Sequence, residues 1–209
     1  MMIAIVDYGC GNIRSVANAL ERLDCQHVLT GDAALIRSCD KVILPGVGND
    51  AEALQNLRLK GLDRVIKDLR KPVLGICVGM QIMCRDSEEV AAGSPERTVQ
   101  GLGIFDSHVR RFPTCADAKV PHMGWNCIGN LNLGKCRLFE GLDSLKSGRY
   151  MYFVHSYYPS LCQDTIATCR HGNILFSAAL KYENFYGTQF HPEKSGEAGE
   201  RLLKNFIDL

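Results

Sequence analysis

Short apolar runs alternate with helical patterns along the first half of the chain. The apolar runs predict strands at 2–6, 26–29, 41–44 and 72–76, and the spacing of apolar residues predicts helices at 13–23, 33–36, 50–69 and 79–85. Strands that alternate with helices in this way are typical of βαβ units and a parallel sheet. Right-handed crossovers place the carboxyl ends of such strands along one edge, where ligands usually bind.

The pattern changes in the second half of the chain. A polar loop at 86–100 is followed by strand-like pieces at 103–109, 150–155, 165–170 and 174–180, then a strand at 185–190 and a helix at 196–206. These pieces predict an antiparallel or mixed portion folded back on the same sheet. No repeat, low-complexity stretch or linker divides the chain. We therefore expect one α/β domain over 1–209, with a three-layer, mostly parallel sheet flanked by helices and an added mixed portion.

Composition and charge remove several classes of protein. The 209 residues are 46% hydrophobic, which is ample for a core, and the net charge is only +1. Without a basic patch, neither nucleic acid nor an anionic membrane is expected as a partner. The apolar N-terminal run ends at Asp7 and has no basic flank, so it predicts a first strand rather than a signal peptide. No apolar stretch is long enough to span a bilayer.

The ten cysteines suggest neither a metal site nor a disulfide framework. They include no C-x-x-C pair and no cluster with histidine at zinc-ligand spacing. A chain with a sizeable core does not need disulfides, so we expect reduced thiols and a cytoplasmic protein with no metal.

One cysteine differs from the others in its surroundings. Cys77 is the centre of Gly75-Ile76-Cys77-Val78-Gly79, where a predicted strand passes into a predicted helix. This is the cysteine counterpart of the G-x-S-x-G nucleophile elbow, in which glycines allow two backbones to approach closely. A helix N-terminus favours the thiolate form. Cysteine is usually buried as core filler, but the glycine bracket makes Cys77 the candidate nucleophile.

A histidine and a glutamate could complete a triad with this cysteine. His191-Pro192-Glu193 ends the predicted strand at 185–190, and side chains at i and i+2 of an extended chain point the same way. Histidine would take the thiol proton, and glutamate would fix the tautomer of the ring. Alone, the tripeptide would be better interpreted as a solvated loop, but together with the elbow it favours a triad.

A second glycine loop is expected on the same edge. Pro45-Gly46-Val47-Gly48 follows the strand at 41–44. Acyl transfer needs N–H donors for a developing oxyanion, and Val78 N–H and this loop could supply them. From the motif alone a plain strand-to-helix turn is equally consistent. A phosphate cradle is disfavoured because no G-K-[ST] ending is present.

These motifs together resemble the class I, triad-type glutamine amidotransferases. Within that family the chain is similar, from end to end, to the glutaminase subunits of imidazole glycerol phosphate synthases in L-histidine biosynthesis. The narrower resemblance is carried by Asp7-Tyr8-Gly9-Cys10-Gly11-Asn12, Pro121-His122-Met123-Gly124-Trp125-Asn126, Phe153-Val154-His155-Ser156-Tyr157 and the extension Lys194-Ser195-Gly196 after His-Pro-Glu.

The resemblance implies a hydrolysis of L-glutamine to L-glutamate and ammonia through a cysteine thioester, with no cofactor. It assigns catalysis to Cys77, His191 and Glu193, and the oxyanion hole to Val47, Gly48 and Val78. It places Gly48, Gln81, Ser156 and Tyr157 around the substrate.

The resemblance also implies a partner. In the family, ammonia passes to a cyclase subunit with a (β/α)8 barrel, in a heterodimer that makes imidazole glycerol phosphate and aminoimidazole carboxamide ribotide. The residues expected at that interface are Asn12, Arg14, Met123, Trp125, Asn126 and Lys194.

Three alternatives remain at this point. A paralogous subunit could feed ammonia to another synthase, for example one that aminates a sugar for surface polysaccharide. Peptidase-like or stress-related relatives of the fold also carry an elbow cysteine and a histidine, but they lack the Pro-Gly-Val-Gly loop combined with His-Pro-Glu. A binding module without activity is disfavoured by the intact set of Cys77, His191 and Glu193.

Overall fold

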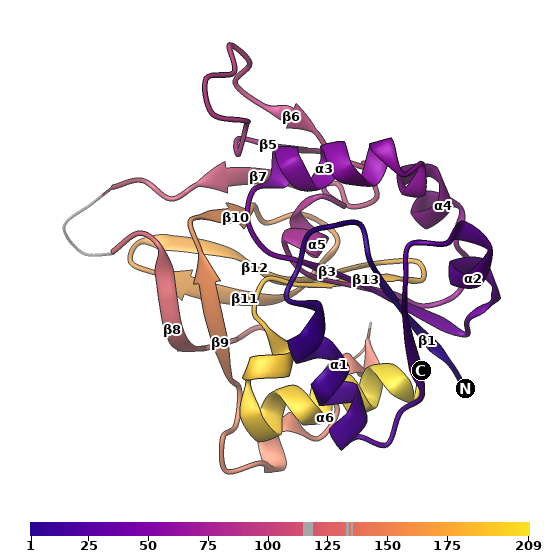
Figure 1. The fold of residues 1–209 in the computed structure, drawn as a ribbon. Coiled ribbons are helices and arrows are strands. Elements are labelled where there is room, and N and C mark those ends of the chain that lie inside the picture. The colour runs from indigo at the N-terminus through magenta and orange to yellow at the C-terminus, as the bar shows by residue number, and fades with distance from the viewer. Residues whose placement is uncertain (115–118, 133, 135) are drawn as a thin grey trace.

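Strands from both halves of the chain form one seven-stranded sheet in the order β11-β12-β13-β4-β3-β1-β2 (Figure 1). The computed structural model describes residues 1–114, 119–132, 134 and 136–209. The sheet strands are β1 (Ile3–Val6), β2 (His27–Thr30), β3 (Lys41–Gly46), β4 (Val73–Cys77), β11 (Thr165–His171), β12 (Ile174–Tyr182) and β13 (Phe185–Thr188). Five of them, from β13 to β2, run parallel, whereas β11 and β12 are antiparallel. The expected parallel sheet with an antiparallel addition is confirmed.

The register of the central strands brings the candidate loops together. Gly46 at the end of β3 pairs with Cys77 at the end of β4, and Thr188 at the end of β13 pairs with Ile76. Every residue of β1, β3, β4 and β13 is buried, as expected of strands covered on both faces. The carboxyl ends of three adjacent strands therefore meet at one place on the sheet edge.

Helices cover both faces of the sheet. α1 (Ile13–Arg22) and α6 (Gly196–Ile207) lie on one side, and α3 (Asp50–Leu59) and α4 (Leu62–Asp68) lie on the other (Figure 1). The remaining α-helices are α2 (Ala33–Ser38), which contacts α4, and α5 (Val78–Gln81). The single helix expected at 50–69 was wrong. It is broken at Gly61, whose φ of +66° is left-handed and suits glycine.

The strands outside the main sheet differ most from expectation. β5 (Asp86–Ser87), β6 (Val99–Gln100), β7 (His108–Arg111) and β10 (Tyr157–Pro159) form a four-stranded sheet, and β8 (His122–Cys127) pairs with β9 (Tyr150–His155). The strand expected at 103–109 begins only at His108. β8 was not expected, because Pro121 stands directly before it and Gly124 interrupts its pattern of apolar residues. Short 3₁₀ turns are η1 (Arg137–Phe139), η2 (Leu142–Ser144) and η3 (Pro192–Lys194).

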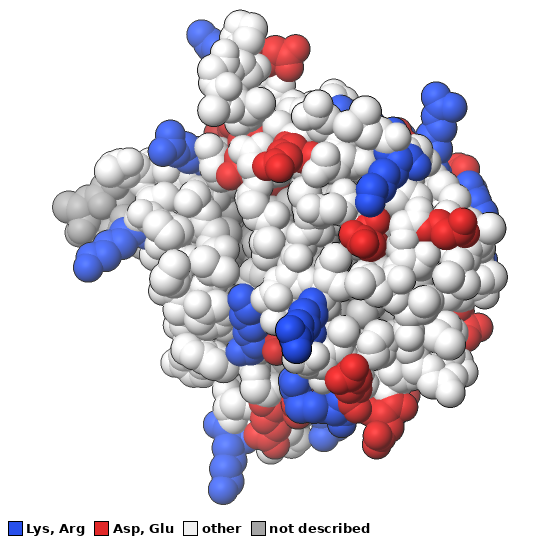
Figure 2. Space-filling model, viewed as in Figure 1, with Lys and Arg blue, Asp and Glu red and all other residues white. Residues whose placement is uncertain are grey.

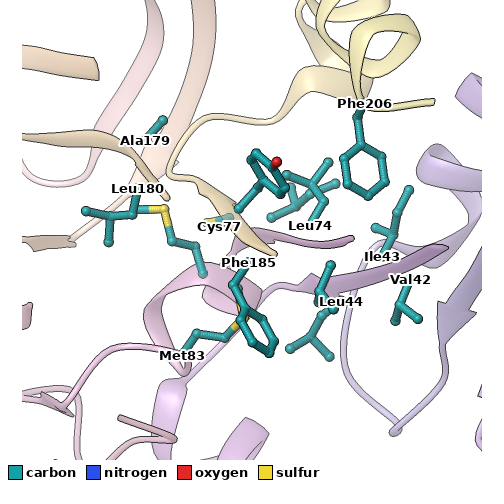
Figure 3. Packing of buried hydrophobic residues seen from close by; sticks show 14 of the residues in the cluster. Val42, Ile43, Leu44, Leu74, Cys77, Met83, Ala179, Leu180, Phe185 and Phe206 are labelled. Atoms are coloured by element: carbon teal, nitrogen blue, oxygen red, sulfur yellow. The ribbon is translucent and has the colours of Figure 1, made fainter. Parts of the chain in front are cut away.

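The main core lies between the sheet and its helices and extends to the turn at Cys77. Leu44, Leu74 and Met83 pack in the region around Cys77 (Figure 3). This packing holds the turn at Cys77 in place. Among the described residues, every helix is too short or too polar to cross a membrane. The described part of the chain also holds no cluster of three or more His, Cys, Asp or Glu side chains arranged for a metal ion.

Candidate active site

Cys77 sits on a strained turn between β4 and α5. Its φ of +54° with ψ of −112° lies outside the regions that most residues adopt. The flanking glycines permit the turn, since a Cβ atom at Gly75 would lie 2.7 Å from the carbonyl oxygen of Gly79. A Cβ at Gly79 would overlap the carbonyl oxygen of Leu44 in the neighbouring strand. The close backbone approach expected of a nucleophile elbow is present.

The helix after the elbow is shorter than expected. The prediction of a helix over 79–85 was wrong, because α5 ends at Gln81. The carbonyl groups of Ile82 and Met83 then accept hydrogen bonds from the backbone N–H groups of Leu102 and Ile104 instead of continuing a helix. Tertiary pairing therefore replaces helical bonds at this point.

His191 and Glu193 form a buried pair. His191 Nδ1 lies 2.8 Å from Glu193 Oε1, and both side chains are almost inaccessible to solvent. The expectation of an extended tripeptide was wrong, because Glu193 lies in the 3₁₀ turn η3. The turn still brings the carboxylate back to the ring, so the contact forms by another route. His191 Nδ1 can then donate its proton in a hydrogen bond to Glu193, and His191 Nε2 is free to exchange a proton with groups in the active site.

Two neighbouring charges govern the protonation of His191. Burial alone would lower its pKa, but the Cys77 sulfur and the Glu193 carboxylate outweigh burial and raise that pKa to about 10. An imidazolium is therefore favoured at neutral pH when the sulfur opposite it is a thiolate. His191 Nε2 is buried and has no hydrogen-bond partner among the described residues.

One cavity of about 180 Å³ brings most of the candidate residues together. Its lining includes every residue expected in the oxyanion hole or around glutamine, together with Cys77 and His191: Val47, Gly48, Cys77, Val78, Gln81, Ser156, Tyr157 and His191. Glu193 is not part of the lining and lies behind His191. The cavity therefore contains a nucleophile, a proton carrier and the polar side chains of Gln81, Ser156 and Tyr157.

A buried hydrogen bond holds the start of the loop that follows the β3 strand. The buried Tyr8 hydroxyl donates to the carbonyl oxygen of Pro45 at 2.7 Å. Three residues beyond Pro45, Gly48 has a φ of +100°, which disfavours any side chain there. Val47 and Gly48 thus reach the cavity on a loop held at its base.

The sulfur of Cys77 ends a chain of side-chain amides. Gln189 Nε2 donates to Cys77 Sγ at 3.6 Å, and Gln81 Nε2 donates to Gln189 Oε1 at 3.0 Å. Gln81 Nε2 also donates to the carbonyl oxygen of Tyr157 at 2.8 Å. Both N–H groups of Gln81 are therefore used, and its Oε1 remains for a ligand.

Comparison with known proteins decides the family. The model of the family "Glutamine amidotransferase class-I" matches residues 4–209. The chain belongs to the class-I glutamine amidotransferases. It is 50% identical over 210 residues to imidazole glycerol phosphate synthase subunit HisH of Bacteroides thetaiotaomicron, covering 100% of both proteins. It is 42% identical over 209 residues to the HisH subunit of Methanocaldococcus jannaschii, again covering 100% of both.

Solved structures support the same fold for this amidotransferase. A putative GMP synthase protein from Thermoplasma acidophilum has a TM-score of 0.70 and 23% identity, over 100% of this chain and 92% of that protein. PurLQS from Thermotoga maritima has a TM-score of 0.66 and 16% identity, over 99% of this chain and 97% of that protein. At these identities the likeness concerns the fold alone.

The cavity of this amidotransferase also contains a residue that sequence analysis missed. Glu89 lines it, and Glu89 Oε2 accepts the backbone N–H of Asp50 at 3.0 Å. Burial raises the pKa of Glu89, whereas the bond from Asp50 lowers it less. In the sequence Glu89 is one of several acids in a polar loop, and its contact with Asp50 joins residues far apart in the chain.

Three of the six residues expected to meet a partner lie on β8, divided between its two faces. Met123 and Trp125 are 63% and 55% exposed. Trp125 packs edge-on against Tyr152, and Lys194 lies over the same ring. Asn126 points the other way and donates to the carbonyl oxygen of Arg170, so its side chain is occupied within the chain. Arg14 is exposed and Asn12 partly exposed at the start of α1.

Two buried histidines lie at the cavity: His155 is part of its lining, and His122 is hydrogen-bonded to His155. Burial lowers the pKa of His122 to about 4 and that of His155 to about 3. Both rings are therefore neutral in the folded protein at pH 5–7. The unfolded chain, with an ordinary histidine pKa near 6.5, takes up protons as the pH falls through that range.

We expect this pair to make the protein sensitive to mild acid. Because the folded pKa values are depressed, their contribution to stability is present above pH 6.5 and is lost below it. The free energy of unfolding should fall by about 2 kcal/mol between pH 6.5 and 5.5. His191, whose pKa is raised, acts in the opposite direction, but its stabilisation is lost mainly as the pH rises above 6.5. Urea unfolding at both pH values measures the change, and His122→Phe should remove about half of it.

Proposed function

We propose that this chain hydrolyses L-glutamine to L-glutamate and ammonia, as the glutaminase subunit of an imidazole glycerol phosphate synthase in histidine biosynthesis. The observation that carries the proposal is the buried His191–Glu193 pair beside the strained Cys77 at one cavity. The HisH relatives, matched over their full length, favour this pathway over the amination of a sugar.

The proposed reaction begins with the ion pair between Cys77 and His191. The thiolate attacks the side-chain amide carbon of glutamine, and the imidazolium of His191 gives its proton to the departing nitrogen, which leaves as ammonia. Water then attacks the thioester while His191 Nε2 accepts its proton, and glutamate and the thiolate are released. Glu193 holds Nδ1 throughout and stabilises the charged ring.

The other residues that line the cavity are proposed to bind glutamine and to stabilise the oxyanion. Val78 N–H follows the nucleophile, and Val47 and Gly48 also line the cavity, so these N–H groups are the proposed oxyanion donors. The glutamine α-ammonium is a cation, which the Glu89 carboxylate and Gln81 Oε1 can accept. The remaining lining residues are Val154, His155, Ser156 and Tyr157.

We propose further that β8 and β9 dock on a cyclase subunit with a (β/α)8 barrel. Figure 2 shows that the surface over these strands is largely uncharged, whereas Lys and Arg side chains gather beside it over α1 and the start of α6. Exposed Met123 and Trp125 lie on this surface, and aromatic residues often dominate binding energy.

Removal of the Trp125 ring is expected to weaken this partnership. Trp125→Ala should raise the Kd for the cyclase by at least about tenfold, since a central aromatic contributes about 2 kcal/mol or more. Titration calorimetry measures this Kd. Leu59→Ala is the matched control, because Leu59 is 77% exposed at the end of α3, away from β8 and β9 (Figure 1). A Kd that changes equally in both variants would place the interface elsewhere.

The experiment that tests the function measures glutamate release from glutamine. The purified chain is assayed alone, and with the cyclase of the same organism and its nucleotide ligand. We expect the loaded partner to give the higher rate. Hydroxylamine in place of water should give the γ-glutamyl hydroxamate, because it intercepts a thioester. Release that ignores the cyclase would indicate another ammonia acceptor, and no release under any condition would refute the assignment.

A further inference from the structure

His122 and His155 form a direct hydrogen bond in the interior. The two residues are 4% and 5% exposed, and His122 Nδ1 lies 3.0 Å from His155 Nε2. His155 also lines the cavity. Phe153 and His171 stack on His122 at 4.8 and 4.2 Å, and Phe176 packs against both buried histidines. Within the described part of the chain, neither buried ring is hydrogen-bonded to a carboxylate. Two imidazoles in such surroundings are stable only when they are neutral.

The neighbours of the pair fix the tautomer of each ring. His155 Nδ1 lies 2.7 Å from the carbonyl oxygen of Tyr157, which can only accept, so Nδ1 carries the proton and Nε2 accepts. His122 Nδ1 must then donate to His155, and His122 Nε2 must accept. Asn126 Nδ2 supplies that donor at 3.1 Å. Every bond in the series therefore has one allowed direction.

The series continues beyond Tyr157 to the nucleophile. The Tyr157 carbonyl oxygen accepts from His155 and also from Gln81 Nε2. Gln81 donates its other N–H to Gln189, and Gln189 donates to Cys77 Sγ. The last donor faces the sulfur, which suits a thiolate. A continuous hydrogen-bonded path thus links Asn126, on β8, to the reacting atom.

We propose that His122 and His155 are positioning residues for glutamine hydrolysis. As neutral rings with protonated Nδ1, they hold the Tyr157 carbonyl in place, and this carbonyl orients the Gln81 amide so that its Oε1 faces the substrate. The inference rests on the proposed function, because it gives the pair a role in binding glutamine. It also gives the inward face of β8 a physical connection to the cavity, while Met123 and Trp125 occupy the outward face.

The orientation of Gln81 depends on this carbonyl for a simple reason. If the Tyr157 carbonyl moved away, Gln81 would lose one of two acceptors that distinguish its N–H₂ group from its oxygen. The amide could then rotate and present an N–H group to the cationic α-ammonium of glutamine. Binding of glutamine would weaken, whereas the pairing of Cys77 with His191 would be unchanged.

Substitutions at His155 separate the hydrogen bond from the ring. We expect His155→Phe, in complex with the cyclase, to raise the KM for glutamine about tenfold and to lower kcat less than about threefold, since a lost buried hydrogen bond has an effect of this size. His155→Asn keeps a donor near Nδ1 and should restore KM to within about threefold of the unmodified protein. His171→Phe is the matched control, because His171 stacks on the same cluster but lies outside the path. Its KM should stay within about twofold of the unmodified value.

A spectroscopic measurement tests the path without any turnover. In ¹⁵N-histidine NMR spectra at pH 7, both buried rings should be neutral and protonated at Nδ1. A ring protonated at Nε2, or an imidazolium at either position, would overturn the proposal. So would a KM for His155→Phe that equals that of His171→Phe. If His155→Phe does not fold, the Asn variant and the NMR spectrum decide. If the unmodified complex releases no glutamate, the proposed function fails, while the NMR spectrum still tests the path.

Discussion

Replacement of Cys77 by alanine should reduce glutamate release by at least about 10⁴-fold. Loss of a covalent nucleophile has effects of this size, because the remaining groups act together with it and contribute little alone. The geometry gives a specific reason here. Cys77 lines the cavity together with His191, and its Sγ accepts a hydrogen bond from the Gln189 amide. In the alanine variant no sulfur is left to form a thioester.

A matched control is available seven residues farther along the chain. Cys84 is also a fully buried free thiol, but it does not line the cavity. Cys84→Ala should lower the free energy of unfolding by about 1 kcal/mol and leave kcat within about twofold, because only packing is lost. Both variants are assayed for glutamate release in the presence of the cyclase. If Cys77→Ala retained more than about 1% of the activity, a thioester mechanism would be ruled out.

The elbow shows why some of the site could be predicted from sequence. The glycines two residues before and two residues after Cys77 predict that two backbones approach closely there. The structure shows this close approach at both positions. The alternation of apolar runs with helical patterns likewise reflects local burial. Both signals are contained in short stretches of chain, so they can be recognised without knowing which distant residues pack against them.

Features that depend on distant partners could not be predicted in this way. Glu89 lines the cavity, where its carboxylate accepts the backbone N–H of Asp50, and one acid in a polar loop carries no sign of that contact. Asn126 is expected at an interface, and the alternation of β8, a strand with a weak apolar pattern, places it on the face opposite Met123 and Trp125, where it donates to the Arg170 carbonyl oxygen. The contact between His191 and Glu193 was anticipated, yet through an extended tripeptide rather than the turn that forms it.

The same close approach makes Gly79→Ala the substitution at the elbow that we expect to be most damaging. In Gly79→Ala, the new methyl group would overlap the carbonyl oxygen of Leu44. That oxygen belongs to the backbone of β3, which pairs with both β1 and β4 at the centre of the sheet. Neither neighbour can move without separating strands, so the overlap cannot be relieved by rotation of a side chain.

We therefore expect Gly79→Ala to lower the free energy of unfolding by about 3 kcal/mol or more, with loss of glutamate release in whatever fraction still folds. Urea unfolding followed by circular dichroism measures the first effect. Gly129→Ala is the control, since a Cβ there would make an ordinary contact of 3.9 Å with Thr168 Oγ1. Its stability should change by less than about 0.5 kcal/mol. If the two variants were equally stable, the elbow would not need close packing against β3, and the strained geometry of Cys77 would require another cause. If Gly79→Ala folded normally but lost activity, the glycine would serve the alignment of the sulfur rather than the stability of the sheet.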